Sequence, residues 1–357
     1  MISDHYPPTV LDVPLVEHGY ILGIETSCDE TAAAVLSRDG VLVSNLVATQ
    51  YEVHQRFGGV VPELASRKHT EQIEETVQEV MRCAGSQFPD IKGVAVTQGP
   101  GLAGALLVGV SFAKALAYAQ GIPCIAVNHL EGHLASAWLS QPDLTPPCVI
   151  LVVSGGHTHL YFVPKFREYH LIGHTLDDAA GEAFDKAARI LGLKFPGGPE
   201  IEKFSKLKNK SFPKLPRPLI KGSLDFSFSG LKSSLIRYAE EKKWYPKNNN
   251  KIDPEDISEV ASAFQEAVVD TLLRNTIKAI EKYDVKALIL GGGVTANSLL
   301  REKAKAESPI PVIVPSPKLC TDNGAMIATA GYFESKGLEK NELHQWAMDA
   351  IPNLKLG

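Results

Sequence analysis

Residues 20–49 are YILGIETSCDETAAAVLSRDGVLVSNLVAT. An apolar run is followed by a polar turn, a second apolar run, a short Arg-Asp-Gly turn and a third apolar run. This alternation predicts three strands joined by two hairpin turns. The same layout returns in residues 148–175, CVILVVSGGHTHLYFVPKFREYHLIGHT. The chain therefore contains two copies of one three-stranded unit.

Each copy is followed by a glycine-rich junction between a strand and a helix. The junctions are VAVTQGPGLAGALLVGVSFAKAL in residues 94–116 and ALILGGGVTANSLLREKAKA in residues 287–306. Free backbone N–H groups and the positive helix end suit such junctions to phosphate. One glycine turn usually only closes a tight connection, but two in register with two hairpin units favour a duplicated α/β fold.

This organisation is similar to the actin-like ATPase fold, in which two lobes hold a nucleotide in the cleft between them. On that basis we expect an N-terminal extension over 1–19, a first lobe over 20–147 and a second lobe over 148–331. The remaining residues, 332–357, are expected to form a C-terminal segment that packs back on the first lobe. The resemblance in topology leaves the reaction open.

Composition excludes some classes of protein. Of 357 residues, 44% are hydrophobic and 22% charged, as in an ordinary globular protein, and the net charge of −5 excludes a uniformly basic nucleic-acid binder. Residues 203–221 nevertheless carry seven basic side chains and no acid, so this run is a candidate for contact with a phosphate backbone, or is solvated surface. Five scattered cysteines and no signal-peptide pattern indicate a cytoplasmic protein. The apolar region 104–119 contains Lys114 and is expected to be too short to cross a membrane.

Residues 127–138, VNHLEGHLASAW, contain the histidines His129 and His133. Asn128 predicts a helix start, and side chains four apart on a helix lie about 6 Å apart at Cβ, so both imidazoles can reach one metal ion. The alternative is two solvated helix histidines. His170 and His174 have the same spacing on a predicted strand, where four residues cover about 13 Å, too far to share an ion.

A zinc-protease signature is excluded, because it requires H-E-x-x-H and Glu131 stands two positions after His129. Other carboxylates keep two interpretations. Asp185 either pairs with Arg189 on a solvated helix face or binds a ligand, and Asp322 is either a helix cap or a ligand. Glu30 stands beside the first hairpin turn, where its role is open.

Taken together, several motifs in order resemble the tRNA N6-adenosine threonylcarbamoyltransferase family, formerly called O-sialoglycoprotein endopeptidase. They are GIETSCDETAAAV, GGVVPELASRKH, QGPGLAGALLVG, NHLEGH, VSGGHT, DDAAGEAFDKAARILGL, PGGP, DFSFSGLK, GGGVTAN and CTDNGAMIA. The resemblance runs from about residue 21 to residue 331. The forms SCDET and SGGHT resemble the bacterial and organellar branch.

The resemblance implies a set of site residues. One divalent metal ion per subunit, Fe²⁺ in preference to Zn²⁺, is expected on His129, His133 and Asp322. An adenylate or ATP-type nucleotide is expected on a set of second-lobe residues. These are Val152, Val153, Ser154, Gly155, Gly156, Asp185, Gly198 and Asn297. Glu30 is our hypothesis for the acid–base residue.

The implied reaction moves a threonylcarbamoyl group from threonylcarbamoyl-AMP to N6 of the adenosine 3′ of the anticodon. The substrates are tRNAs that read codons starting with A. The resemblance also implies a degenerate paralogous dimerisation partner and a small ATPase partner. Three alternatives stay open: a sugar-kinase-like phosphotransferase, a carbamoyltransferase acting on a small molecule, and a non-catalytic scaffolding paralogue. The last should lack the histidine pair, which this chain retains.

Overall fold

The computed structural model describes residues 19–37, 39–206, 215–245, 252–336 and 346–356. The chain divides into two compact units, the first comprising Met1–Leu144 with Thr321–Leu356 and the second Thr145–Cys320. Each unit is built on its own five-stranded sheet. The N-terminal extension expected over 1–19 lies almost wholly outside the described residues.

The first sheet begins with the predicted hairpin unit. Its strands are β1 (Tyr20–Glu25), β2 (Glu30–Ser37), β3 (Leu42–Thr49), β4 (Ile91–Gly99) and β5 (Cys124–Asn128), in the order β3-β2-β1-β4-β5. β2 is antiparallel to both β1 and β3, whereas β4 is parallel to β1 and to β5. The central strands are buried on both faces, which explains their almost continuous apolar sequence.

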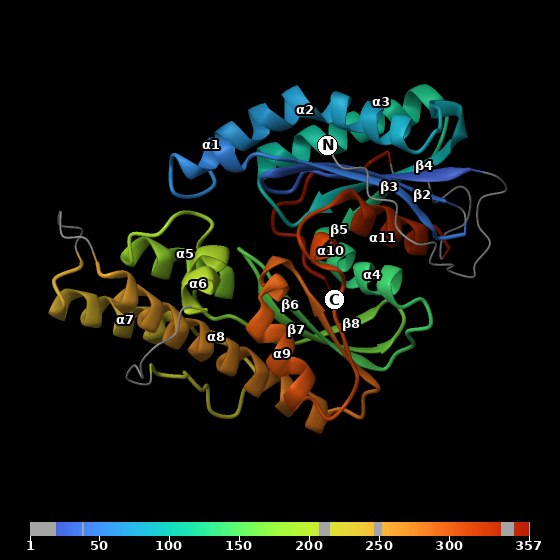
Figure 1. The fold of residues 1–357 in the computed structure, drawn as a ribbon. Coiled ribbons are helices and arrows are strands. Elements are labelled where there is room, and N and C mark those ends of the chain that lie inside the picture. Colours follow the sequence, from blue (N-terminus) through green and yellow to red (C-terminus); the bar gives the residue numbers. More distant parts are fainter. Residues whose placement is uncertain (1–18, 38, 207–214, 246–251, 337–345, 357) are drawn as a thin grey trace. The chain divides into compact units, whose positions relative to one another are not determined.

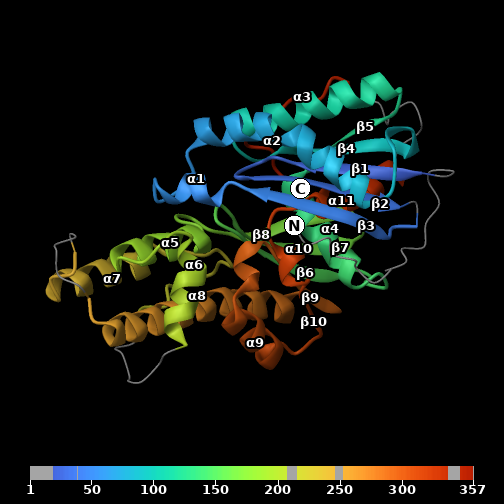
Figure 2. The same cartoon turned by 45° about the horizontal axis from the view of Figure 1, so that its top comes forward.

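Helices cover both faces of this sheet (Figures 1 and 2). On one face, α2 (Pro62–Cys83) and α3 (Ala103–Gln120) pack on β2 and β4, and the short α1 (Tyr51–Gln55) precedes α2. On the other face, α11 (Gly324–Lys336) packs on β1, β2 and α4 (His129–Ser140). A 3₁₀ turn, η1 (Phe88–Asp90), leads into β4.

Residues 321–331 were expected in the second lobe, but they belong to the first unit, in which helix α11 packs. Close approach to the sheet is possible because Gly23 in β1 lacks a side chain: a Cβ there would overlap the backbone of α11 at Ala328 and Gly324. The described residues 346–356 also lie on this unit, where the N–H of Ile351 donates to the carbonyl of Gln98 at 2.8 Å. Lys114 Nζ donates to the Met348 carbonyl at 3.1 Å.

The apolar region around Lys114 was expected to be too short to cross a membrane, which is wrong by length and composition alone: helix α3 passes that test. Its residues Ala105, Leu106, Val110 and Ala113 are buried in the first unit. It packs against α2 and β4, so α3 is a core helix of the unit.

The second sheet repeats the topology of the first. Its strands are β6 (Cys148–Val153), β7 (Thr158–Lys165), β8 (Glu168–His174), β9 (Ala287–Gly291) and β10 (Val312–Ile313), in the order β10-β9-β6-β7-β8. β7 is antiparallel to β6 and β8, and β9 is parallel to β6 and β10. The predicted duplication is therefore confirmed strand by strand.

The helices of the second unit are α5 (Ala180–Ile190), α6 (Gly197–Ser205), α7 (Ser229–Glu241), α8 (Pro254–Lys282), α9 (Ser298–Glu307), α10 (Pro317–Cys320) and the 3₁₀ turn η2 (Gly293–Ala296). Helices α5 to α9 form one apolar core with the sheet. The long helix α8 contributes Phe264, Val268 and Leu272 to this core. The second glycine junction is thus a strand, a 3₁₀ turn and a helix, rather than a direct passage from strand to helix.

Candidate metal centre

Both histidines of the HLEGH motif lie in the first turns of α4. Strand β5 ends at Asn128, whose side-chain oxygen accepts from the N–H of Leu130 at 2.9 Å and caps the helix. Because the rings stand one turn apart, their centroids are 4.7 Å from each other. The side chain of His129 is 6% exposed and that of His133 is 1% exposed, which contradicts the alternative of solvated histidines.

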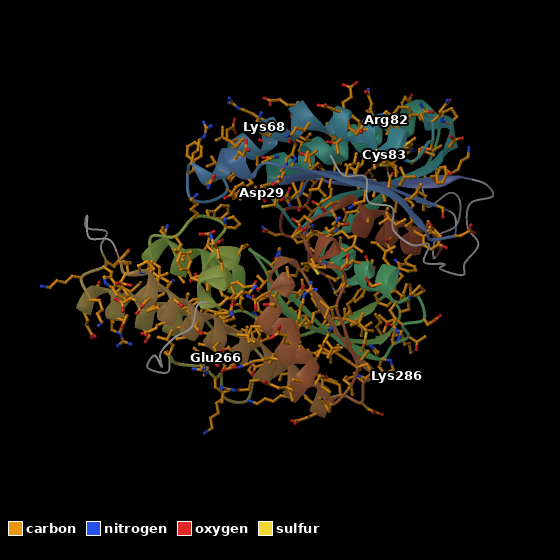
Figure 3. The ribbon with its side chains drawn as sticks, in the orientation of Figure 1. Asp29, Lys68, Arg82, Cys83, Glu266 and Lys286 are labelled. Atoms are coloured by element: carbon orange, nitrogen blue, oxygen red, sulfur yellow. The ribbon has the colours of Figure 1, made fainter. Side chains whose placement is uncertain are left out.

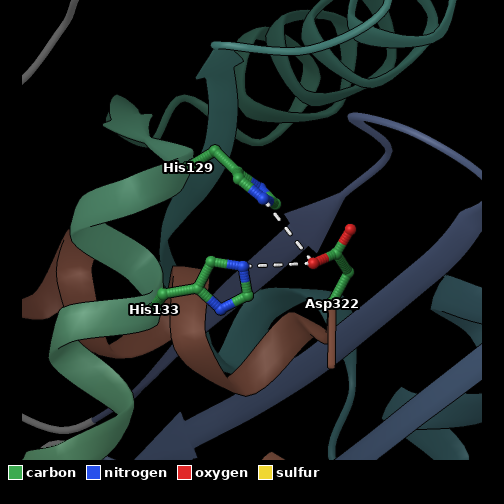
Figure 4. A group of neighbouring side chains, drawn as sticks. All are labelled: His129, His133 and Asp322. Atoms are coloured by element: carbon green, nitrogen blue, oxygen red, sulfur yellow. Dashed lines mark ion pairs between the residues drawn. The ribbon is translucent and has the colours of Figure 1, made fainter. Parts of the chain in front are cut away.

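Asp322 brings a carboxylate to the two rings (Figure 4). Its Oδ1 lies 3.2 Å from His133 Nε2 and 3.6 Å from His129 Nε2. Asp322 is not the cap of α11, since Asn323 Oδ1 accepts from the N–H of Met326 at 3.0 Å. The two helices approach closely at Gly132, where a Cβ would lie 2.8 Å from the end of the Ile327 side chain.

Glu25, the last residue of β1, orients the ring of His129. This carboxylate is fully buried, and its Oε2 lies 3.0 Å from His129 Nδ1. Thr97 donates to the same oxygen at 2.5 Å, and the Ser27 N–H donates to the other. An Nδ1–H that donates to Glu25 leaves Nε2 facing Asp322, the arrangement in which a carboxylate holds a metal-binding histidine. Glu25 was not among the predicted site residues.

The group fits a divalent cation. The ligand atoms of His129, His133 and Asp322 all lie within 4.8 Å of one another. Neither ring nitrogen of His133 has a hydrogen-bond partner among the described residues, although both are buried. Burial alone would lower the pKa of His129, but Asp322 and then Glu25 outweigh it and raise the pKa to about 9. The two imidazole nitrogens and the Asp322 carboxylate are stabilised by a positive charge between them, which either a proton or a metal ion can supply.

More carboxylates lie at the adjoining turn between β1 and β2. Asp29 is labelled in Figure 3 at this turn, and Glu30 begins β2. Glu30 Oε1 accepts from Thr49 Oγ1 at 3.1 Å, while Oε2 is buried without a hydrogen bond to any described residue. Burial, then Asp29 and Asp322, raise the pKa of Glu30 to about 8. A carboxyl with this pKa exchanges its proton near neutral pH.

In the second unit, predicted nucleotide residues gather where β6 ends. Val152 and Val153 are the last residues of β6, and the turn that follows is held by Ser154, whose oxygen accepts from the His157 N–H at 3.1 Å. Gly155 and Gly156 are exposed, and no atom would meet a Cβ there within 4 Å. Their backbone is therefore accessible to a ligand.

The other predicted nucleotide residues have different surroundings. Asp185 lies on α5 and accepts from the N–H of Gly197 at 2.6 Å, beside Gly198. Asn297 caps α9 by accepting from the Leu300 N–H at 3.1 Å, and its amide donates to Gln265 at 2.8 Å. The backbone of Asn297 is engaged as well, because its N–H donates to the Val294 carbonyl at 3.0 Å and its carbonyl accepts from the Arg301 N–H at 3.2 Å.

The basic run 203–221 is described only outside 207–214. On either side of that gap, Lys206 pairs with Glu202 at 3.1 Å and Arg217 pairs with Asp270 at 2.8 Å. These two cations are held by acids of their own unit.

Comparison with known proteins agrees with the motifs. The family profile of tRNA N6-adenosine threonylcarbamoyltransferase matches residues 41–329. The chain is 46% identical over 342 residues to the tRNA N6-adenosine threonylcarbamoyltransferase of Clostridium kluyveri, covering 94% of this chain and 98% of that protein. The protein of the same name from Clostridium perfringens is 48% identical over 341 residues, with the same coverage.

Solved structures confirm the actin-like fold. Full-length HypF in its phosphate- and nucleotide-bound form matches with a TM-score of 0.61 at 14% identity, over 93% of this chain and 48% of that chain. Component A of the Acidaminococcus fermentans (R)-2-hydroxyglutaryl-CoA dehydratase matches with a TM-score of 0.54 at 14% identity, over 89% and 99%. At such identities the likeness concerns the fold alone.

Proposed function

The chain belongs to the tRNA N6-adenosine threonylcarbamoyltransferase family, and from this premise we propose how its residues divide the work. The protein transfers the threonylcarbamoyl group from threonylcarbamoyl-AMP to N6 of the adenosine 3′ of the anticodon, in tRNAs that read codons starting with A. The observation that carries this conclusion is the identity of 46% over 94% of the chain to a protein of that name.

His129, His133 and Asp322 would hold one divalent metal ion, iron in preference to zinc. A metal there would act as a Lewis acid toward an oxygen of the donor. The residues around it have their own tasks: Glu25 and Ser27 hold Nδ1 of His129, at 3.0 and 3.1 Å, and so direct Nε2 toward the site. Trp138 and Leu134 of α4 are buried, which keeps the helix fixed.

Glu30 receives the proton of the attacking amine. N6 of adenine attacks the carbamoyl carbon, a new C–N bond forms, the bond from that carbon to the phosphate oxygen breaks, and AMP leaves. The proton lost from N6 passes to the Glu30 carboxylate. Its pKa of about 8 supports this role, because a base is most effective when its pKa lies near the working pH.

Residues of the second unit bind the adenylate. The exposed backbone of Gly155 and Gly156 offers N–H groups to phosphate, next to Val152, Val153 and Ser154. Asp185, Gly198 and Asn297 are assigned to the nucleoside. The protein acts in the cytoplasm, with a degenerate paralogue and a small ATPase as its partners, as expected for the bacterial branch.

One assay tests the proposal. The purified protein, loaded with Fe²⁺ or Zn²⁺, is incubated with threonylcarbamoyl-AMP and unmodified tRNA, and the digested nucleosides are analysed by mass spectrometry. We expect threonylcarbamoyladenosine, lost after chelation and restored by metal. Phosphate transfer from ATP to a small molecule, with no modified nucleoside and no effect of chelator, would instead establish a phosphotransferase.

A further inference from the structure

A chain of buried polar side chains crosses the first unit behind the β1–β2 turn. It consists of His54 in α1, Gln50 before that helix and His69 in α2, which are 0%, 2% and 0% exposed. His54 Nε2 lies 3.1 Å from Gln50 Oε1, and Gln50 Nε2 lies 3.3 Å from His69 Nδ1. The metal site and the nucleotide residues do not account for this chain.

The carbonyl of Ala65 and the N–H of Val61 fix the direction of the hydrogen bonds between His54, Gln50 and His69. Gln50 Nε2 donates to the Ala65 carbonyl at 3.3 Å, so a flipped amide would place two acceptors together. The N–H of Val61 donates to His54 Nδ1 at 3.3 Å, so the proton of His54 is on Nε2 and is donated to Gln50. The amide of Gln50 then donates to His69 Nδ1, which the Thr31 hydroxyl also contacts, at 2.8 Å. His69 therefore carries its own proton on Nε2.

The Nε2 proton of His69 makes a hydrogen bond to the turn between β1 and β2. His69 Nε2 donates to the carbonyl of Cys28 at 3.0 Å. The backbone N–H of Gln50 donates to the next carbonyl, that of Asp29, at 3.1 Å. Two consecutive carbonyls, directly before Glu30, are thus held by two members of the buried chain.

The same turn is tied to the metal centre on its other side. Ser27 Oγ lies 3.1 Å from His129 Nδ1, and Glu25 holds the same ring nitrogen. Only two residues, Cys28 and Asp29, separate Ser27 from Glu30. A shift of the Cys28 and Asp29 carbonyls would change the distance between the proposed base and the metal-binding histidine.

We propose that His69 is a positioning residue for threonylcarbamoyl transfer, which sets Glu30 through its Nε2–H bond to the Cys28 carbonyl. Gln50 supports it by fixing the tautomer of the ring and by holding the Asp29 carbonyl. The proposal rests on the proposed function, since it names how the base of that reaction is placed. Burial lowers the pKa of His69, which agrees with a neutral ring that has one proton.

The test compares two substitutions at one position. In His69→Gln the amide nitrogen can take the place of Nε2 and keep the donor to Cys28, whereas in His69→Asn the shorter amide matches Nδ1 and loses that donor. The control is His170→Asn, on the exposed β8 strand, where the ring contacts Glu168. For each protein we measure metal content, thermal stability, affinity for tRNA and the single-turnover transfer rate.

We expect His69→Asn to lower the single-turnover rate about 10- to 100-fold at unchanged metal content and tRNA affinity, because small misplacements of catalytic groups cost this much. His69→Gln should recover most of the rate, and His170→Asn should retain all of it. Equal rates in the Gln and Asn variants, with equal losses of stability, would show a purely structural role and overturn the proposal.

A readout that does not depend on activity separates this proposal from the function. In wild-type protein, ¹⁵N NMR of the His69 ring should show the Nε2–H tautomer, and amide exchange at residues 28–30 should be faster in His69→Asn than in His69→Gln. An Nδ1–H tautomer, or equal exchange in the two variants, would overturn the positioning role even if transfer is observed. Absence of transfer by the wild type, with these NMR results intact, would refute the function and leave the held turn established.

Discussion

Glu25 is the side chain whose replacement tests the metal centre most directly. The substitution Glu25→Gln keeps the shape and removes the charge. The carboxylate accepts from three donors, the His129 ring, the Thr97 hydroxyl and the Ser27 N–H. A glutamine presents one acceptor and one NH₂ group, so either the ring or the Ser27 N–H must face a donor.

The magnitude follows from burial and from the partners. A buried donor left unsatisfied costs about 1–3 kcal/mol, and Glu25 is fully buried, so we expect the free energy of unfolding of the metal-free protein to fall by that amount. A carboxylate behind a metal-binding histidine contributes roughly 10- to 100-fold to metal affinity. We therefore expect the Kd for Zn²⁺ or Fe²⁺ to rise by about this factor, equivalent to roughly 1.4–2.8 kcal/mol.

The assay is a competition titration of the metal against a chromophoric chelator at fixed pH. Glu79→Gln is the matched control, because Glu79 pairs with Arg82 on the outer face of α2, where Figure 3 labels Arg82. The control should bind metal as the wild type does. Unchanged metal affinity in Glu25→Gln would refute the reasoning that Glu25 directs His129 toward a cation.

Four further outcomes are expected. His133→Ala removes a buried ligand atom, so metal measured by elemental analysis should fall well below one ion per chain, and transfer should be lost with it. Gly23→Ala places a Cβ against the backbone of α11, so urea unfolding should show a loss of about 1–3 kcal/mol. Asp178→Asn breaks two lysine ion pairs, at 2.6 and 2.8 Å, and should cost about 1 kcal/mol in urea, since these lysines are partly exposed. The single-turnover rate should rise with pH as Glu30 ionises and reach a plateau at or below about pH 8, because a cation on Asp322 lowers the pKa of Glu30. Glu30→Gln should abolish this rise. A rate that falls over the same pH range would contradict the role of Glu30 as a base.

The sequence predicted the fold well where local pattern decides it. Hairpin turns, buried apolar strands and glycine junctions each have a pattern within a short stretch of sequence, so the duplicated sheets could be predicted. The place of α11 could not, because its apolar sequence fits either sheet equally well. The close packing of α11 on β1 requires the absence of a side chain at Gly23, and the contact of Gly23 with Ala328 is visible only in the structure.

The candidate site was predictable to a different degree for each residue. The spacing of His129 and His133 is meaningful on a helix and meaningless on a strand, so a helix prediction was enough to select that pair over His170 and His174. The partnership of His129 with Glu25 joins residues more than a hundred positions apart, and a carboxylate at a strand end gives no local sign of it. Asn297 was predicted as a nucleotide-binding residue, but its side chain is occupied in capping α9. The sequence pattern does not distinguish these two roles.

The first unit is assembled from two stretches of chain, separated by the whole of the second. A nascent polypeptide that has emerged only as far as Leu144 has both imidazoles but lacks the aspartate, and the sheet face that α11 will cover is still bare. The ribosome must therefore synthesise nearly the entire protein before the three side chains can come together. An interrupted or truncated product cannot offer a cation the set of three donors that the complete chain presents.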